Sequence, residues 1–228
     1  MIHLRYISSL VFISLLLSAS LFAQQNKFDI GMDGGPGISK FYGSDASHLQ
    51  PIVAGSAGVA FQYNFPKIFS IRTGLDYERK GWEATVTFID VYGNPVATTL
   101  DNFHFDYLTI PVLARATFGK KVRFFVNAGP YFSVLLRTAG ILGGSTGIIP
   151  LEIVNATSTF KPFDFGISAG AGIEIPIIER FGITVEARNN VGLINVADKP
   201  IYNNGNIKSY ATVFLVGFEY KFGMRGKS

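Results

Sequence analysis

The feature that most constrains this chain is a period-two alternation of apolar with small or polar residues, which recurs eight times. Successive side chains of a strand point to opposite faces, so each alternating stretch predicts a strand with one apolar face. In the last stretch, SYATVFLVGFEYKF, Phe214 and Phe218 share one face while Gly217 and Glu219 share the other. The eight predicted strands cover residues 27–39, 52–65, 68–80, 102–118, 122–137, 162–176, 181–194 and 209–222.

The connections between these predicted strands alternate between short and long. The short ones are residues 66–67, 119–121 and 177–180, and all the others are much longer. An up-and-down meander with its long loops at one end has this pattern, which is typical of outer-membrane barrels with short periplasmic turns. The spacing therefore predicts an all-β fold, an eight-stranded antiparallel up-and-down transmembrane β-barrel.

The apolar faces are predicted to contact lipid rather than fill the barrel. In the sixth predicted strand, Phe163, Phe165 and Ile167 share one face, and Gly166 and Ser168 share the other. An eight-stranded barrel is only wide enough for side chains to fill it, so rings of Phe would overfill its lumen. Charged residues make up only 16% of the chain, against about 25% in soluble domains. We therefore expect the outer membrane as the location and its lipids as partners.

Aromatic residues gather near both ends of the predicted strands, with aliphatic residues between them. Aromatic rings settle at the two interfaces of a bilayer, so this placement predicts two aromatic girdles. The predicted girdle near the short turns contains Tyr63, Phe65, Phe69, Phe118, Phe124, Phe181, Tyr220 and Phe222. The predicted girdle near the long loops contains Phe41, Tyr42, Trp82, Phe103, Phe105, Phe163, Phe165 and Tyr210.

Charges of both signs lie on the faces that would point into the lumen. Buried charges must pair, so we expect an ion-pair network that plugs the barrel. Glu186 and Arg188 lie two apart on one strand face, and we expect them to pair with Glu174 or Glu219 on neighbouring strands. The predicted interior polar network is Arg72, Asp76, Glu78, Arg115, Glu174, Glu186, Arg188 and Glu219. The other charges expected inside are Asp29, Asp33, Arg123, Arg137 and Lys221.

The first residues predict an export signal. Residues 1–23 have a basic start, an apolar run and small residues near a cleavage point after Ala23, which is the organisation of a secretory signal peptide. Residues 24–228 are then expected to form one outer-membrane β-barrel domain. No 18-residue apolar run follows that would predict a helical membrane span.

Several function classes lack their signatures. The net charge of +4 is scattered, so no nucleic-acid partner is expected. There is no cysteine, and no phosphate-binding, dinucleotide-binding or zinc-protease motif occurs, so we expect no enzyme activity, cofactor or metal. His104 and Asp106 share one strand face near the long-loop rim, where a barrel lipid hydrolase would keep an acid–base pair.

Two irregularities interrupt the pattern of the fourth and fifth predicted strands. Pro111 and Pro130 fall inside strands of a closed barrel and lie nearly opposite one another, which suggests a shared bulge or notch. The alternation also slips near Tyr107, where Phe103 and Phe105 fall out of phase with the residues that follow. We expect a bulge there.

Three segments resemble a known family. DYLTIPVLAR (106–115), NAGPYFSVLL (127–136) and DFGISAGAGIEI (164–175) are similar to blocks of the PorT-like outer-membrane β-barrel proteins of the Bacteroidota. The resemblance extends over the whole mature chain and implies an eight-stranded, OmpA-like or porin-family barrel. A role in protein secretion is known for the named member and is not implied for every relative.

The expected function is that of a non-enzymatic outer-membrane barrel with a plugged interior and long extracellular loops. It would act as a structural, binding or secretion-accessory component, with a protein or ligand partner at the loops, above all at residues 138–161. The alternatives are a small porin-like transport protein, a barrel lipid hydrolase and a soluble lipocalin-like binder.

Overall fold

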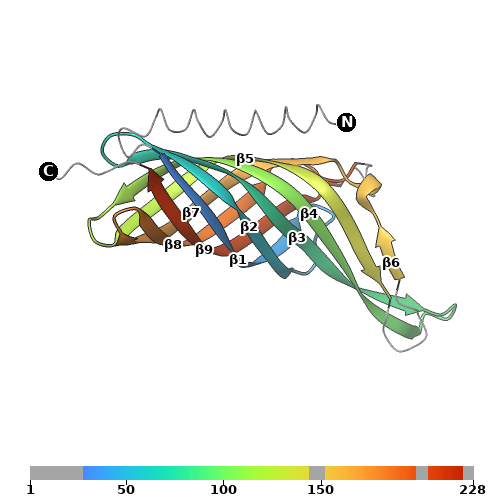
Figure 1. The fold of residues 1–228 in the computed structure, drawn as a ribbon. Helices are drawn as coiled ribbons and strands as arrows, with labels where there is room; N and C mark the ends of the chain where they lie inside the picture. Colours follow the sequence, from blue (N-terminus) through green and yellow to red (C-terminus); the bar gives the residue numbers. More distant parts are fainter. Residues whose placement is uncertain (1–27, 144–151, 199–204, 223–228) are drawn as a thin grey trace, which may run out of the picture.

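The protein is a barrel of eight long antiparallel strands with one short additional strand (Figure 1). The computed structural model describes residues 28–143, 152–198 and 205–222. The strands are β1 (Phe28–Tyr42), β2 (Ile52–Asn64), β3 (Phe69–Ile89), β4 (Pro95–Phe118), β5 (Arg123–Leu142), β6 (Glu152–Asn155), β7 (Phe163–Ile178), β8 (Phe181–Gly192) and β9 (Lys208–Phe222), with a short 3₁₀ helix at Thr157–Thr159.

The eight long strands form a closed ring. Each pairs with its neighbour along the chain, β5 pairs with β7, and β9 returns to pair with β1. β6 lies outside this ring and pairs only with the loop end of β5. The predicted all-β, eight-stranded, antiparallel up-and-down barrel is therefore confirmed. Among the described residues, no helix is long and apolar enough to cross a membrane.

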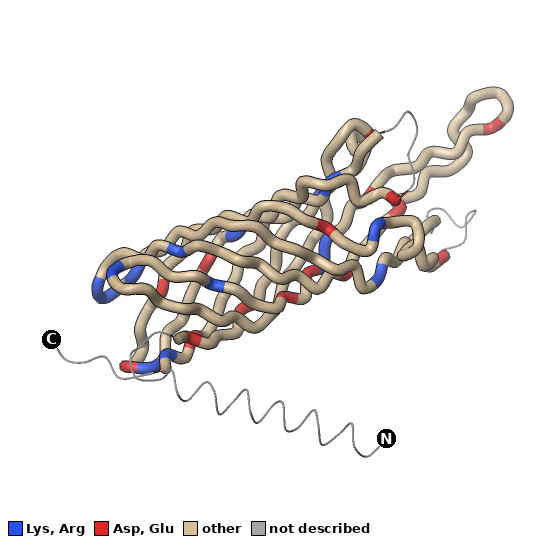
Figure 2. The backbone as a smooth tube through the Cα atoms, turned by 90° about the horizontal axis from the view of Figure 1, so that it is seen from above, with Lys and Arg blue, Asp and Glu red and all other residues tan. Residues whose placement is uncertain are grey.

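The loop predicted between the third and fourth strands is a β-hairpin instead. β3 and β4 stay paired beyond the barrel wall, and residues 81–101, here called the arm, project from it (Figures 1 and 2). The alternating run Thr85–Phe88 already has strand character. At the tip, the Asp90 carboxylate accepts hydrogen bonds from the backbone N–H groups of Tyr92 (2.8 Å) and Asn94 (2.9 Å). The hydrogen bonds from Asn94 and then Tyr92 lower the pKa of Asp90.

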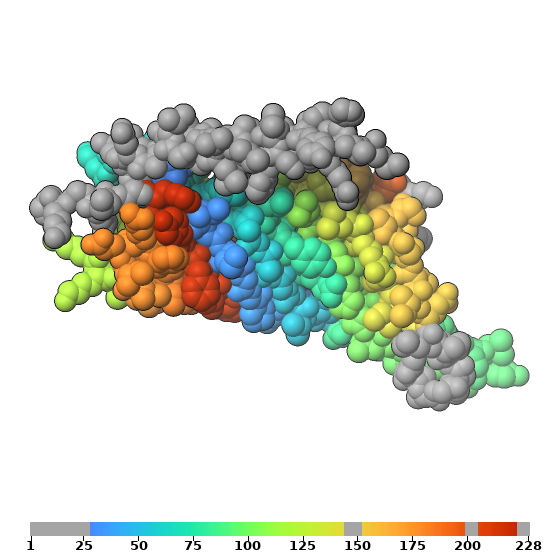
Figure 3. All heavy atoms as spheres, in the orientation of Figure 1, coloured from blue at the N-terminus to red at the C-terminus, as the bar shows by residue number. Residues whose placement is uncertain are grey.

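The two faces of the wall divide as predicted. On β9, Phe214 and Phe218 are 58% and 57% exposed on the outer face, whereas Leu215 and Glu219 are buried inside. Figure 3 shows that side chains cover the outer wall wherever the wall can be seen. The outer surface is therefore apolar, and the lumen receives the small and charged residues.

The bulge expected near Tyr107 lies in β5 rather than β4. β4 alternates without a slip, and both Phe105 and Tyr107 point inward and are fully buried. Asp106 lies opposite Arg137 and Tyr107 lies opposite Leu135, so Leu136 is the additional residue. Because the bulge reverses the alternation of β5, Arg137 is exposed on the outer face, and the expectation that it lies in the lumen is wrong.

The aromatic residues at the two ends of the barrel behave differently. Near the short turns, Phe69, Phe124 and Phe181 are exposed on the outer face, as expected for a girdle. Near the long loops, Phe41 and Phe105 point inward, and their ring centroids lie 4.9 Å apart. The loop-end girdle is therefore wrong for these two residues. It is also wrong for Trp82 and Phe103, which have the same inward phase and pack against the same buried cluster.

Pro111 and Pro130 lie where the pairing of the wall is interrupted. Between β4 and β5 the paired register runs from Pro111 opposite Tyr131 to Ala114 opposite Ala128, so Pro130 falls in the gap. Pro111 falls in a second gap between β3 and β4, where its carbonyl accepts a 2.7 Å hydrogen bond from the Thr73 hydroxyl. A proline has no N–H to donate, so these gaps accommodate both residues.

Candidate functional site

The centre of the lumen is occupied by ion pairs that connect strands across the barrel. On β3, Arg72 lies 2.6 Å from the Asp33 carboxylate of β1 through Nη2 and 2.5 Å from the Glu219 carboxylate of β9 through Nη1. All three side chains are buried. The charged face of β3 is placed inward by its alternation, and each charge there finds an opposite one, as buried ions require.

Arg115 joins this centre from β4, the strand paired with β3. Its guanidinium lies 3.5 Å from the carboxylates of both Glu186 and Glu219, and it donates a 3.0 Å hydrogen bond to the Gln62 side chain. The guanidinium carbon also lies 3.8 Å from the centroid of the Phe125 ring. Arg115 therefore contacts two carboxylates and also stacks on the Phe125 ring, so ionic and cation–π interactions both hold its side chain.

Glu186 and Arg188 pair with each other rather than with Glu174 or Glu219. Arg188 donates two hydrogen bonds to the Glu186 carboxylate, at 2.7 and 3.1 Å, and lies 3.3 Å from Asp76 of β3. The expectation of pairing with neighbouring strands is wrong, because two long side chains on one strand face can reach each other directly. We call Asp33, Arg72, Asp76, Arg115, Glu186, Arg188 and Glu219 the central network.

Glu174 belongs to a separate group near the short turns. Its Oε1 accepts hydrogen bonds from both Arg123 and Lys221. These three residues form the turn-end triad. The Arg123 and Lys221 side chains are each 16% exposed, whereas the residues of the central network are almost fully buried. The triad is therefore the part of the predicted network nearest to solvent.

A further polar cluster lies toward the loops. The Lys80 ammonium is 3.3 Å from the Glu78 carboxylate and 3.5 Å from that of Asp164, and it lies 4.7 Å from the centroid of the Tyr131 ring. The Ser209 hydroxyl donates a 2.5 Å hydrogen bond to Asp164. These five residues form the loop-end polar cluster. Glu78 also accepts hydrogen bonds from the side chains of Thr109 and Asn190.

Sequence reasoning missed Lys80 and Asp164 as members of the interior network. The signal was present, because Lys80 has the same strand phase as Arg72 and Glu78, and Asp164 has the phase of Glu174. The predicted third strand ended at Lys80. The strand in fact continues to Ile89, so Lys80 lies inside the barrel.

An apolar cluster lies beyond this polar cluster at the loop end. Strand residues and loop residues pack together there, and the loop residue Val196 is fully buried. The loop backbones are joined by hydrogen bonds, from Val196 to Ile207 and from Lys161 to Val196. The cluster, here called the loop-end cap, consists of Phe41, Ala46, Phe105, Tyr107, Leu135, Val196 and Ile207.

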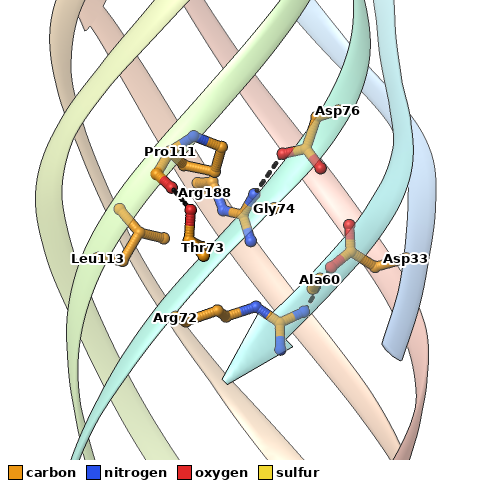
Figure 4. Close-up of a pocket in the computed structure, with 9 residues that line it drawn as sticks. All are labelled: Asp33, Ala60, Arg72, Thr73, Gly74, Asp76, Pro111, Leu113 and Arg188. Carbon is orange, nitrogen blue, oxygen red and sulfur yellow. Dashed lines mark hydrogen bonds and ion pairs between the residues drawn. The ribbon is translucent and has the colours of Figure 1, made fainter. Parts of the chain in front are cut away.

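A small crevice follows the interrupted pairing beside Pro111. Figure 4 shows Arg188 directed at Asp76 and Arg72 directed at Asp33 behind this part of the wall, while Thr73 contacts Pro111. The charges that line it are therefore already engaged with one another. Among the residues described, no group of three or more His, Cys, Asp or Glu side chains could hold a metal ion.

His104 and Asp106 do not form the acid–base pair considered for a hydrolase. Asp106 is bonded to Arg79 by hydrogen bonds of 2.8 and 3.3 Å. Within the described part of the chain, the Nδ1 atom of His104 has no hydrogen-bond partner. Both residues share one face of β4, as predicted, and this is the outer face, but the Asp106 carboxylate is paired with an arginine.

Solved outer-membrane proteins are similar to the chain over most of its length. Neisserial surface protein A is 15% identical with a TM-score of 0.49, covering 86% of this chain and 97% of that one. Ail of Yersinia pestis, solved in complex with the heparin analogue sucrose octasulfate, is 11% identical with a TM-score of 0.42, covering 85% and 99%. OprG from Pseudomonas aeruginosa is 14% identical with a TM-score of 0.42, covering 88% and 99%.

At these identities and TM-scores the likeness transfers no binding property to this chain. No curated protein matches the sequence. Residues 22–198, more than half of the chain, match the family model described as "Outer membrane protein beta-barrel domain". Together with the closed eight-stranded ring and its apolar outer face, this match shows that the chain belongs to the outer membrane protein β-barrel domain family and lies in the outer membrane.

Proposed function

We propose that the protein is a non-enzymatic, non-conducting outer-membrane barrel that acts through its extracellular segments as a binding component. The observation that carries this proposal is the succession of charged groups along the lumen. The turn-end triad, the central network and the loop-end polar cluster follow one another, and the loop-end cap lies beyond them. An ion entering such a lumen would have to displace paired charges and then apolar side chains.

The arm is the part of the protein best placed to meet a partner outside the cell. Val91 and Tyr92 at its tip are 93% and 87% exposed, and Ile89 is 64% exposed. Between residues 84 and 100 the only charge is Asp90. Exposed apolar groups on a projecting segment are typical of interaction sites. Residues 138–161 were the first expectation for this role, and residues 144–151 of that segment lie outside the described residues.

Several narrower assignments rest on this proposal. The resemblance to PorT-like barrels supports a secretion-accessory version, in which the arm would contact a component of a secretion complex. Residues 1–23 are proposed as the signal peptide that brings the chain to the envelope, and they lie outside the described residues. The soluble lipocalin-like alternative is set aside by the outer-membrane location.

Planar-bilayer recording tests the closed lumen. The folded, purified protein is expected to give no discrete conductance steps at neutral pH in molar salt. Phe105→Gly with Arg115→Ala removes one side chain from the loop-end cap and one from the central network. This variant is expected to conduct more than the unchanged protein, and heat-modifiable gel mobility verifies that it is folded. Steady ion-selective openings of the unchanged protein would support the small transport protein instead.

Photo-crosslinking tests the role of the arm. A photoreactive residue at Tyr92 is expected to give a discrete crosslinked product on intact cells, and the same probe at Lys120 in a short turn is the control. Equal products from both positions, or none from Tyr92, would contradict binding at the arm.

A further inference from the structure

Three charged residues form a row on the outer face of the barrel. Arg79 of β3, Asp106 of β4 and Arg137 of β5 lie directly opposite one another on adjacent strands. The Arg79 guanidinium donates to the Asp106 carboxylate through Nε at 2.8 Å and Nη2 at 3.3 Å. Apolar side chains cover most of this outer face, so two arginines and one carboxylate are a marked departure from it.

The bulge of β5 is what places Arg137 in this row. From Phe125 to Leu135 the odd-numbered residues of β5 point inward, and if this alternation continued without the bulge, the Arg137 side chain would also enter the lumen. Bulges redirect side chains and are frequent beside functional sites. Among the described residues, Arg137 forms no ion pair or hydrogen bond. The wall therefore presents an arginine outward beside a pair that already neutralises itself.

The position of the row along the barrel corresponds to the headgroups of the outer leaflet. Ten residues separate Arg79 from Phe69, which is 59% exposed at the turn end of β3. At about 3.3 Å per residue and a strand tilt of about 40°, this separation spans about 25 Å along the barrel axis, the height of the apolar band of such barrels. Tyr77, whose hydroxyl accepts a 3.2 Å hydrogen bond from Arg79, lies just inside that boundary.

We propose that Arg79 and Arg137 bind a phosphate group of an outer-leaflet lipid headgroup. Arginine presents a planar fork of donors that matches phosphate oxygens. Asp106 lies between the two arginines and holds the Arg79 side chain in place. The row carries two positive charges and one negative charge, so one positive charge remains for an anion. This site lies on the lipid-facing wall and is independent of the proposed role of the arm and of the closed lumen.

Native mass spectrometry of the folded protein in a neutral detergent tests the site. The probes are diphosphorylated lipid A, the same lipid A without phosphates, phosphatidylglycerol and inorganic phosphate. We expect a retained adduct with the first probe, and Arg137→Gln and Arg79→Gln are each expected to weaken its binding about tenfold, the loss of one charge-assisted contact. Arg137→Lys is expected to keep part of the affinity. Heat-modifiable mobility verifies that each variant is folded.

The control variant is Lys40→Gln, which removes an outward cation of β1 at the same end of the barrel, placed 5.2 Å from the ring centroid of Tyr210. It is expected to leave binding unchanged. Stronger retention of phosphatidylglycerol than of lipid A would still support a lipid phosphate and would identify the lipid class. Three results would overturn the proposal: equal binding of dephosphorylated lipid A, equal binding of inorganic phosphate, or an equal loss in Lys40→Gln.

Discussion

The two ends of this barrel use the same kinds of residue in opposite ways. At the turn end, aromatic rings such as Phe124 face outward, and the buried carboxylate of Glu174 is paired with partly exposed cations. At the loop end, Phe105 faces inward, and the fully buried Lys80 lies among carboxylates and aromatic rings. Whether a strand position faces outward or inward decides the role of its side chain. An aromatic ring therefore contacts lipid at one position and closes the lumen at another.

The largest expected effect comes from the loop-end cap. Phe105→Ala removes a ring enclosed on all sides by protein, so it loses the transfer term and leaves a cavity, which together cost about 3–5 kcal/mol of unfolding free energy. Phe124→Ala at the turn end removes a ring that is 58% exposed on the outer face, where lipid fills the space, so only a transfer term of about 2 kcal/mol is lost. Urea unfolding in lipid vesicles measures both values. Equal losses would contradict the difference between the ends.

The central network is expected to give the next effect. Glu219→Gln removes the charge that Arg72 and Arg115 share, and breaking a buried ion pair from one side costs about 3 kcal/mol or more. Asp33 and Glu186 remain near the two arginines, which places the loss at the lower limit. The same unfolding assay applies, with the exposed turn residue Glu179→Gln as the control. A loss below about 1 kcal/mol, as for exposed pairs, would show that the network is hydrated.

Smaller effects are expected when the two outer polar groups are compared. Lys80→Met leaves Asp164 and Glu78 with hydroxyl and amide donors, so we expect a loss of about 2 kcal/mol that is independent of salt. Glu174→Gln at the turn end is expected to cost about 1 kcal/mol, and less at high salt, because Arg123 and Lys221 are partly exposed. Unfolding at two salt concentrations distinguishes them. If the loss of unfolding free energy in Lys80→Met depended on salt, ions would have to pass the loop-end cap.

The smallest effect concerns the short turns. Lys67 has a backbone φ of 79°, a left-handed conformation that costs a non-glycine residue energy. Lys67→Gly is expected to raise the unfolding free energy by about 0.5 kcal/mol after the entropic cost of glycine is subtracted. Gly119, with φ of 99°, is the reverse case, and Gly119→Ala should destabilise the barrel. Stabilisation by Gly119→Ala would contradict the assigned turn geometry.

Much of the barrel follows from alternation and loop length, since both reflect a wall with lipid on one side. The eight long strands and their pairing were predictable for that reason. The arm was not, because Gly81, Asn94 and Pro95 interrupt the apolar pattern, and pairing between β3 and β4 continues through Gly81 regardless. The phase of Phe105 was also misjudged, because the irregularity belongs to Leu136 on the next strand.

The interior residues were easier to find than their partners. Phase placed Arg72, Arg115 and Glu219 inside, and the structure brings them together. The direct pairing of Glu186 with Arg188 depends on the narrow lumen and on side-chain reach, which a strand pattern does not encode. The cap depends on loop residues such as Val196, whose packing against the strands arises only once the ring is closed.

Cysteine accessibility at Ser133 tests the closed lumen most directly. The chain has no cysteine, and Ser133 is fully buried on β5, where its hydroxyl lies 2.7 Å from that of Thr109. Ser133→Cys is predicted to remain unlabelled by a small, membrane-impermeant thiol reagent in the folded protein, from either side of the membrane, and to be labelled after unfolding. Tyr92→Cys on the arm should be labelled at once. Labelling of folded Ser133→Cys at a comparable rate would contradict a closed lumen.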